Sequence, residues 1–104
     1  MGTDKRSSPR ILNSIDLECY TIEDSPAPVT ARISDLSTTG AFLDCLNTLP
    51  VGTRLGLRFV LNEHLVTVAS EVMHSMPQFG MGVRFLNLSP ESRAMIESLL
   101  GSQG

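Results

Sequence analysis

The chain has 104 residues, of which 41% are hydrophobic and 18% are charged. This length suits one small domain with a single core, and the composition excludes a disordered chain. No apolar run approaches the ~18 residues of a membrane-spanning helix. The formal net charge of -3 excludes general electrostatic binding to nucleic acid polymers or to an anionic membrane. We therefore expect a soluble globular domain that binds any anionic ligand through a local site.

The positive charge is concentrated at the N-terminus. Residues 1–10 carry three basic side chains against one acidic side chain, whereas the rest of the chain has five arginines against ten carboxylates. This start lacks the apolar segment of a signal peptide. The two cysteines, Cys19 and Cys45, form neither a disulfide framework nor a paired metal motif. We expect a flexible basic arm over residues 1–12 and a reducing, cytoplasmic setting.

Alternation of apolar and polar side chains predicts the strands. Residues 13–22 alternate over one predicted strand, and two prolines in the segment 23–28 end it. Five further strands are expected at residues 29–34, 41–45, 55–61, 65–76 and 82–86. Residues 67–70 do not keep one face strictly apolar, so the fifth strand is expected to carry a bulge or to be covered on both faces.

One amphipathic helix is expected at the C-terminal end, over residues 89–100. Ser89 is a suitable N-cap, Pro90 suits the first helical position, and apolar residues then recur on one helical stripe. Because no strand–helix–strand alternation is present, the fold class is α+β, mainly β, and the strands should form an antiparallel barrel or sandwich. A barrel of this size is filled by its own side chains, so a ligand should bind on its outer wall or rim.

Patterns for catalysis are weak. His64 and His74 are ten residues apart without a matching ligand cluster, so we expect surface histidines and no metal. Ser37 lacks the glycine context of a nucleophile. The segment 80–85 begins like a dinucleotide-binding loop, but Phe85 occupies the position of the third glycine. We therefore expect no enzyme activity and no cofactor.

Two motifs carry the functional hypothesis. In the first, Arg6 and Arg10 are separated by three residues, and Pro9 favours an extended backbone before it. Guanidinium groups bind phosphate oxygens and the guanine edge in a bidentate manner, and they stack on purines. Taken alone, this pattern is better explained by a solvated basic terminus.

The second motif is the segment 35–40. Its simplest interpretation is a hairpin turn between two strands. Asp35 could also accept hydrogen bonds from guanine N1 and N2, and Ser37 could donate to a phosphate. Gly40 would allow an unusual backbone conformation or a close approach. These groups complement a purine phosphate.

Together, and in this order within a β domain closed by a helix, the motifs resemble the PilZ family of cyclic di-GMP receptors. The segment 80–85 is similar to the last-strand pattern of that family. The resemblance implies a six-stranded antiparallel β-barrel over residues 13–104, with the arginines on an N-terminal arm. It implies these cyclic di-GMP-binding residues: Lys5, Arg6, Arg10, Asp35, Ser37 and Gly40. Lys5 stands where many members have arginine. The number of ligand molecules bound per chain, one or two, is therefore left open.

The leading hypothesis is a non-enzymatic cyclic di-GMP receptor or adaptor, monomeric or weakly dimeric. Ligand would order the arm on the barrel, and the new surface would signal to a downstream protein. One alternative is a PilZ-like protein-interaction module with weak or no nucleotide binding, against which the intact arginines and Asp35, Ser37 and Gly40 argue. Phe42 or Phe79, if exposed, would mark a partner surface, but a core or barrel-end position is the favoured role for either aromatic. A second alternative, a binder of single-stranded nucleic acid, is disfavoured by the negative charge and the absence of tryptophan.

Overall fold

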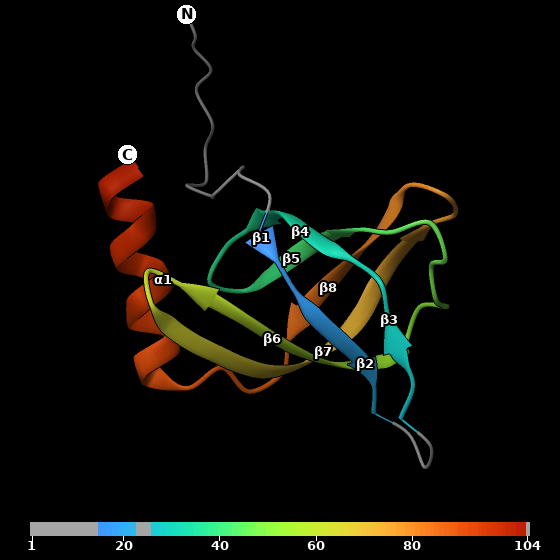
Figure 1. Cartoon of the computed structure of the whole chain (residues 1–104), viewed down its shortest axis with the longest axis horizontal. Helices are drawn as coiled ribbons and strands as arrows, with labels where there is room; N and C mark the ends of the chain where they lie inside the picture. The colour runs from blue at the N-terminus through green and yellow to red at the C-terminus, as the bar shows by residue number, and fades with distance from the viewer. Residues whose placement is uncertain (1–14, 23–25, 104) are drawn as a thin grey trace, which may run out of the picture.

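The computed structural model describes residues 15–22 and 26–103, which form eight strands and one helix (Figure 1). The strands are β1 Ile15–Asp16, β2 Glu18–Thr21, β3 Pro28–Val29, β4 Arg32–Leu36, β5 Gly40–Asp44, β6 Arg54–Leu61, β7 His64–Met76 and β8 Gly80–Phe85, and the helix is α1 Pro90–Gln103. This confirms the mainly β class with a C-terminal helix.

The strands form one antiparallel sheet in the order β1-β4-β5-β8-β7-β6-β2-β3. At one end of this order β1 pairs with β4, placing Ile15 opposite Ile33, and at the other end β2 pairs with β3, placing Cys19 opposite Val29. Since only Leu17 separates β1 from β2 along the chain, the two ends of the sheet lie beside each other. The sheet is therefore curled on itself (Figure 1).

The expectation of six strands is wrong for the part of the chain that the structure describes. The first predicted strand is divided at Leu17, and the second is divided between Val29 and Arg32. The break at Leu17 separates two strands with different partners. Among the described strands β1 pairs only with β4, whereas β2 pairs with β3 and β6. The period-two sequence pattern cannot predict such a break, because apolar and polar side chains continue to alternate across it. Residues 13 and 14 lie outside the described residues.

The expected bulge in the long fifth predicted strand is present, at a different place. The register of β7 against β8 shifts between Val72 and His74, not at residues 67–70. The irregular pattern at 67–70 comes from Ser70, which is fully buried on the core face and donates a hydrogen bond of 3.1 Å to the Leu55 carbonyl oxygen. That hydrogen bond offsets the cost of burying the hydroxyl.

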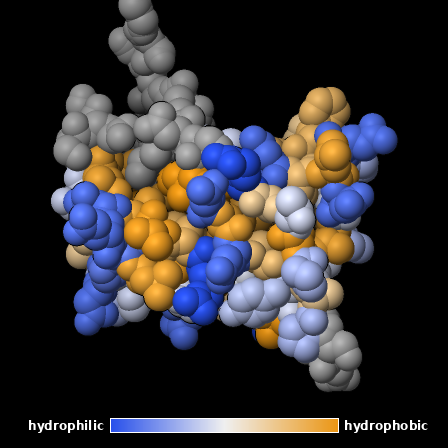
Figure 2. All heavy atoms as spheres, viewed as in Figure 1, coloured by the Kyte–Doolittle hydropathy of each residue, from blue (hydrophilic) through white to orange (hydrophobic). Residues whose placement is uncertain are grey.

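The helix begins as expected. The Ser89 side chain accepts a hydrogen bond of 3.1 Å from the Ser92 backbone N–H, which makes it the N-cap, and Pro90 is the first helical residue. Ile96 is fully buried and Leu100 nearly so. The helix lies at one end of the curled sheet (Figure 1), and apolar side chains gather beside it over β6 and β7 (Figure 2).

The two cysteines are buried and free, and their titration provides a test of the core. Burial raises the pKa of the Cys19 thiol from 9.0 to about 12, with a further contribution from nearby Cys45. Folded protein thus holds this proton more tightly than unfolded protein. The stabilisation is complete below the unfolded pKa and is lost as the pH rises through the folded pKa.

We predict that the free energy of unfolding falls above about pH 9, by about 1.4 kcal/mol per pH unit from this thiol. In Cys19→Ala this part of the slope is absent, whatever the cost of the substitution itself. Urea unfolding of both proteins at several pH values between about 8 and 11 measures the two slopes. Parallel slopes would contradict the assignment.

Candidate functional site

Three of the residues singled out by sequence lie together on the outer wall of the sheet, over the adjacent strands β4, β5 and β8. Asp35, Ser37 and Gly40 line one hollow of about 390 Å³, which also reaches the β7 bulge. We call it the wall hollow. The registers place Asp35 opposite Phe42, and Phe42 opposite Gly82. The site therefore depends on correct pairing of all these strands.

A bulge in β4 gives Asp35 its position. Ile33 and Leu36 are both fully buried although they are three residues apart, which a regular strand does not allow. The register against β5 shifts between Ile33 and Asp35, so Ser34 is an extra residue there. The shift leaves both Ser34 and Asp35 off the core face. Without it, Asp35 would share the buried face with Ile33.

The Ser37 side chain holds the turn between β4 and β5. Its hydroxyl donates to the Gly40 carbonyl oxygen at 3.3 Å and accepts from the Thr39 N–H at 3.3 Å. The Ser37 N–H donates to the same Gly40 oxygen at 3.0 Å. The turn interpretation of this serine is therefore correct. A third contact, of 3.2 Å, joins the Ser37 and Thr39 hydroxyls. All three contacts of the Ser37 hydroxyl are long, and long hydrogen bonds are weak, so the hydroxyl can exchange its partner.

Gly40 is needed because two backbones approach closely. Its position is directly opposite Arg84 in the β5–β8 register. A β-carbon on Gly40 would collide with the Val83 carbonyl oxygen and lie 3.0 Å from the Arg84 α-carbon. Among the glycines that the structure describes, a positive φ is found at Gly52 and not here. Of the two roles expected for Gly40, close approach is the one observed.

Three polar residues of the wall were not assigned to the site by sequence. His74 lines the wall hollow, and Arg84 lines it from β8. Arg84 lies opposite Glu71 in the β7–β8 register, and its Nη2 is 3.4 Å from Glu71 Oε1. Periodicity marks Arg84 and Glu71 as outward-facing polar positions, but only the strand order shows that Arg84 lies between Gly40 and Glu71. The arm residues, Lys5, Arg6 and Arg10, lie outside the described residues.

The charge of the wall is unfavourable for an anion by itself. Among the described residues that line the wall hollow, the Asp35 carboxylate accompanies one guanidinium, that of Arg84, which lies 3.4 Å from Glu71. A doubly charged phosphate ligand would therefore meet no excess of positive charge from these side chains. Binding such a ligand therefore requires cations from elsewhere in the chain.

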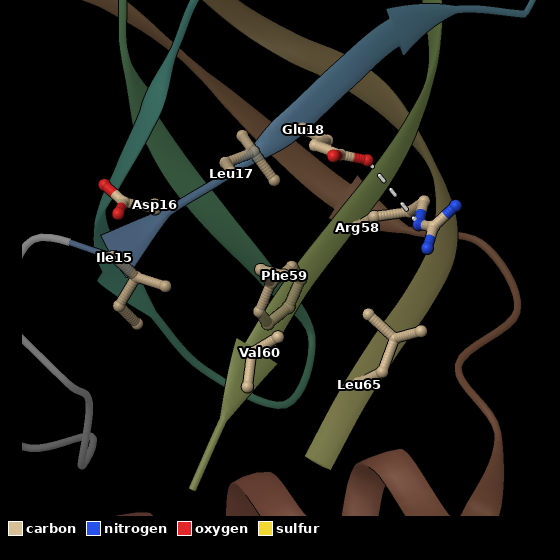
Figure 3. A pocket seen from close by; sticks show the side chains of 8 residues that line it. All are labelled: Ile15, Asp16, Leu17, Glu18, Arg58, Phe59, Val60 and Leu65. Atoms are coloured by element: carbon tan, nitrogen blue, oxygen red, sulfur yellow. Dashed lines mark ion pairs between the residues drawn. The ribbon is translucent and has the colours of Figure 1, made fainter. Parts of the chain in front are cut away.

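A second hollow, of about 670 Å³, lies between β1 and β6 (Figure 3). We call it the β1–β6 hollow. Ile15, Leu17, Val60 and Leu65 give it an apolar lining, and Arg58 lies 3.7 Å from Glu18 at its side. It contains none of the residues singled out by sequence. Apolar walls and compensated charges make it a poor site for a dinucleotide phosphate.

Other chemistry finds little support within the described residues. Residues 15–22 and 26–103 contain no group of three histidine, cysteine or acidic side chains close enough to hold a metal ion. Burial raises the pKa of both thiols, so each stays protonated near neutral pH. No helix in this part of the chain is long and apolar enough to span a membrane.

The fold and the wall define a small β domain with one closing helix and a hollow lined by polar side chains on its outer face. The PilZ domain family profile matches residues 4–102, and the chain belongs to this family of cyclic di-GMP receptors. The match spans the arm motif and the wall motif together. PilZ domains are binding and adaptor modules. No curated protein sequence matches the chain.

Two solved structures share the fold. The PilZ domain of CeSA from a cellulose-synthesizing bacterium has a TM-score of 0.67 and 20% identity, covering 92% of this chain and 98% of its own. The PilZ domain of YcgR from Escherichia coli, with c-di-GMP, has a TM-score of 0.63 and 15% identity, covering 93% of this chain and 91% of its own.

The close approach at Gly40 gives a prediction about stability. Gly40→Ala must push β5 away from β8, because the obstacle is backbone, and overpacking of this kind costs about 1–3 kcal/mol of unfolding free energy. Gly82→Ala is the matched control, since its β-carbon would meet only the His74 ring, at 3.3 Å. Denaturant unfolding of both variants makes the comparison. Equal effects at the two positions would show that the approach at Gly40 is not restrictive.

Proposed function

We propose that the chain is a cytoplasmic, non-enzymatic receptor that binds cyclic di-GMP between its basic arm and the wall hollow. The observation that carries this proposal is the convergence of Asp35, Ser37 and Gly40 around one hollow in a member of the PilZ family. The solved relative from Escherichia coli, which has the same fold, is a structure with c-di-GMP.

Each wall residue has a defined task in this proposal. The Asp35 carboxylate accepts hydrogen bonds from guanine N1–H and the N2 amino group, which adenine lacks. Ser37 releases its long bond to the Gly40 carbonyl oxygen and donates to a phosphate. Gly40 contributes by keeping β5 and β8 in contact, which fixes the distance between Asp35 and the β8 side of the hollow.

The arm supplies the missing positive charge. Lys5, Arg6 and Arg10 offset both the two phosphates and the carboxylates of the wall, and the two arginines donate in a bidentate manner. Ligand then orders the arm on the wall, because its contacts repay the conformational entropy of fixing the arm. The surface formed in this way engages a downstream protein.

The number of cyclic di-GMP molecules bound per chain depends on Lys5, the residue before Arg6. A second, stacked molecule of cyclic di-GMP brings further phosphate charge close to the first, which an extra cation must offset. Lys5 supplies that charge, but unlike an arginine it cannot form bidentate hydrogen bonds or stack on a base. The second molecule should therefore bind more weakly than the first and should be more sensitive to salt.

One observation favours the alternative, an interaction module with weak or no nucleotide binding. Leu46 is 74% exposed and Phe79 is 72% exposed, and the Cys45 N–H bonds to the Phe79 carbonyl oxygen, so the two side chains belong to one end of the sheet. Exposed large apolar groups mark interaction surfaces. A titration with cyclic di-GMP separates the two functions.

We predict that Arg10→Ala and Asp35→Ala each weaken cyclic di-GMP binding about ten- to hundredfold, because each removes charge-assisted hydrogen bonds of about 1.5–3 kcal/mol. Asp35→Ala should also reduce the preference for guanine over adenine. Isothermal titration with cyclic di-GMP, and with cyclic di-AMP and GTP for comparison, measures both effects.

Matched controls use the same substitutions away from the wall hollow. Arg93 on α1 and Asp16 on β1 are exposed and line no part of it, so Arg93→Ala and Asp16→Ala should bind like the unaltered chain. Absence of binding by the unaltered chain would favour the interaction module. Equal losses in the controls would refute the assignment of Arg10 and Asp35.

A further inference from the structure

Arg84 faces the wall hollow from the side opposite to Asp35. It lies between two paired strands, directly across from Gly40 on β5 and from Glu71 on β7. The preceding residue, Val83, is buried in the core, whereas the Arg84 side chain is 58% exposed on the outer face. Arg84 therefore shares one surface with the segment 35–40.

The glycine at position 40 brings Arg84 close to the turn. Gly40 lies directly opposite Arg84, and its backbone packs directly on the backbone of Val83 and Arg84. The Ser37 N–H donates to the Gly40 carbonyl oxygen, so Gly40 belongs to the turn that carries the Ser37 hydroxyl. Ser37 and Arg84 both line the wall hollow. A phosphate in this hollow can therefore be held between a hydroxyl and a guanidinium.

Glu71 restrains Arg84 without occupying all of its donors. The ion pair is long, with 3.4 Å between Arg84 Nη2 and Glu71 Oε1. Only the Arg84 side of the pair is largely exposed, and the Glu71 side chain is half-buried. A guanidinium has five N–H donors in a planar fork, so Arg84 can donate to a phosphate while one donor stays on Glu71, or it can leave Glu71 altogether.

The other four arginines of the described chain are placed differently. Arg32 pairs with Asp16, Arg58 with Glu18 and Arg93 with Glu97. Arg54 lies opposite Glu71 in the β6–β7 register and does not line the wall hollow. Within residues 15–22 and 26–103, Arg84 is the one arginine that lines the wall hollow.

We propose that Arg84 is a further ligand-binding residue, which donates to a phosphate of the dinucleotide from the β8 side, and that Glu71 holds it back in the free protein. This inference rests on the proposed function. The phosphate is then bound from two sides, by the arm and by the wall. Removing the Glu71 charge should free Arg84 and also remove a carboxylate that repels the phosphate.

Isothermal titration with cyclic di-GMP at two salt concentrations tests the proposal on the full chain. Arg84→Ala should bind about tenfold more weakly or worse, with a shallower salt dependence, because one phosphate contact is lost. Arg84→Lys, which keeps the charge but not the fork, should be intermediate, and Glu71→Gln should bind severalfold more tightly. Arg58→Ala, which also removes an arginine paired with a glutamate, should bind like the unaltered chain.

The outcomes distinguish the proposed role of Arg84 from the proposed receptor function. If Asp35→Ala weakens binding while Arg84→Ala and Glu71→Gln do not change it, the role of Arg84 is overturned and the receptor function stands. If the unaltered chain does not bind cyclic di-GMP, both are overturned. If circular dichroism shows that Arg84→Ala is unfolded, the other two variants test the proposal: the affinity for cyclic di-GMP should fall in Arg84→Lys and rise in Glu71→Gln. Unchanged affinity in both would refute the proposal.

Discussion

The contact between the β5 and β8 backbones at Gly40 is the constraint on which the wall depends. A β-carbon at Gly40 would collide with the Val83 carbonyl oxygen, so any other residue there would force these strands apart. The pairing holds the Ser37 turn next to Arg84 on β8. It also keeps Phe42 between Asp35 and Gly82. One missing side chain thereby brings together groups from the three strands β4, β5 and β8.

Charge complements this geometry. The wall hollow presents hydrogen-bonding groups in fixed positions, but among its described lining residues the Asp35 carboxylate balances the Arg84 guanidinium, so it has no excess of positive charge. In the proposed function, such a site would discriminate between bases more than it attracts phosphates. The attraction would come from the basic arm, which is separate in sequence and carries three of the eight basic residues. Dividing selectivity and attraction between two segments would make ligand binding depend on bringing them together, and that dependence would convert binding into a signal.

The sequence predicted those features that depend on one segment at a time. In β6, Leu55, Leu57 and Phe59 alternate and are buried, and the cap at Ser89 begins the helix. It did not predict features that depend on pairing. The bulge at Ser34 shows only as an apolar spacing of three between Ile33 and Leu36, which is ambiguous before the strand is known to pair with β5. The ion pair of Arg84 with Glu71 joins positions 13 residues apart, so it follows from register and not from local pattern. The segment 35–40 was predicted because motif and turn coincide there.

The central claim is that the outer wall over β4, β5 and β8 is the surface that binds cyclic di-GMP. Backbone amide chemical shifts, followed by NMR during titration with cyclic di-GMP, test it most directly because they report every part of the domain in one experiment. The account predicts that the largest shifts fall in residues 35–42, 71–74 and 82–84, and that amides around the β1–β6 hollow, including Val60 and Leu65, stay in place. Shifts concentrated around the β1–β6 hollow, or a wall left unchanged at saturating ligand, would contradict it.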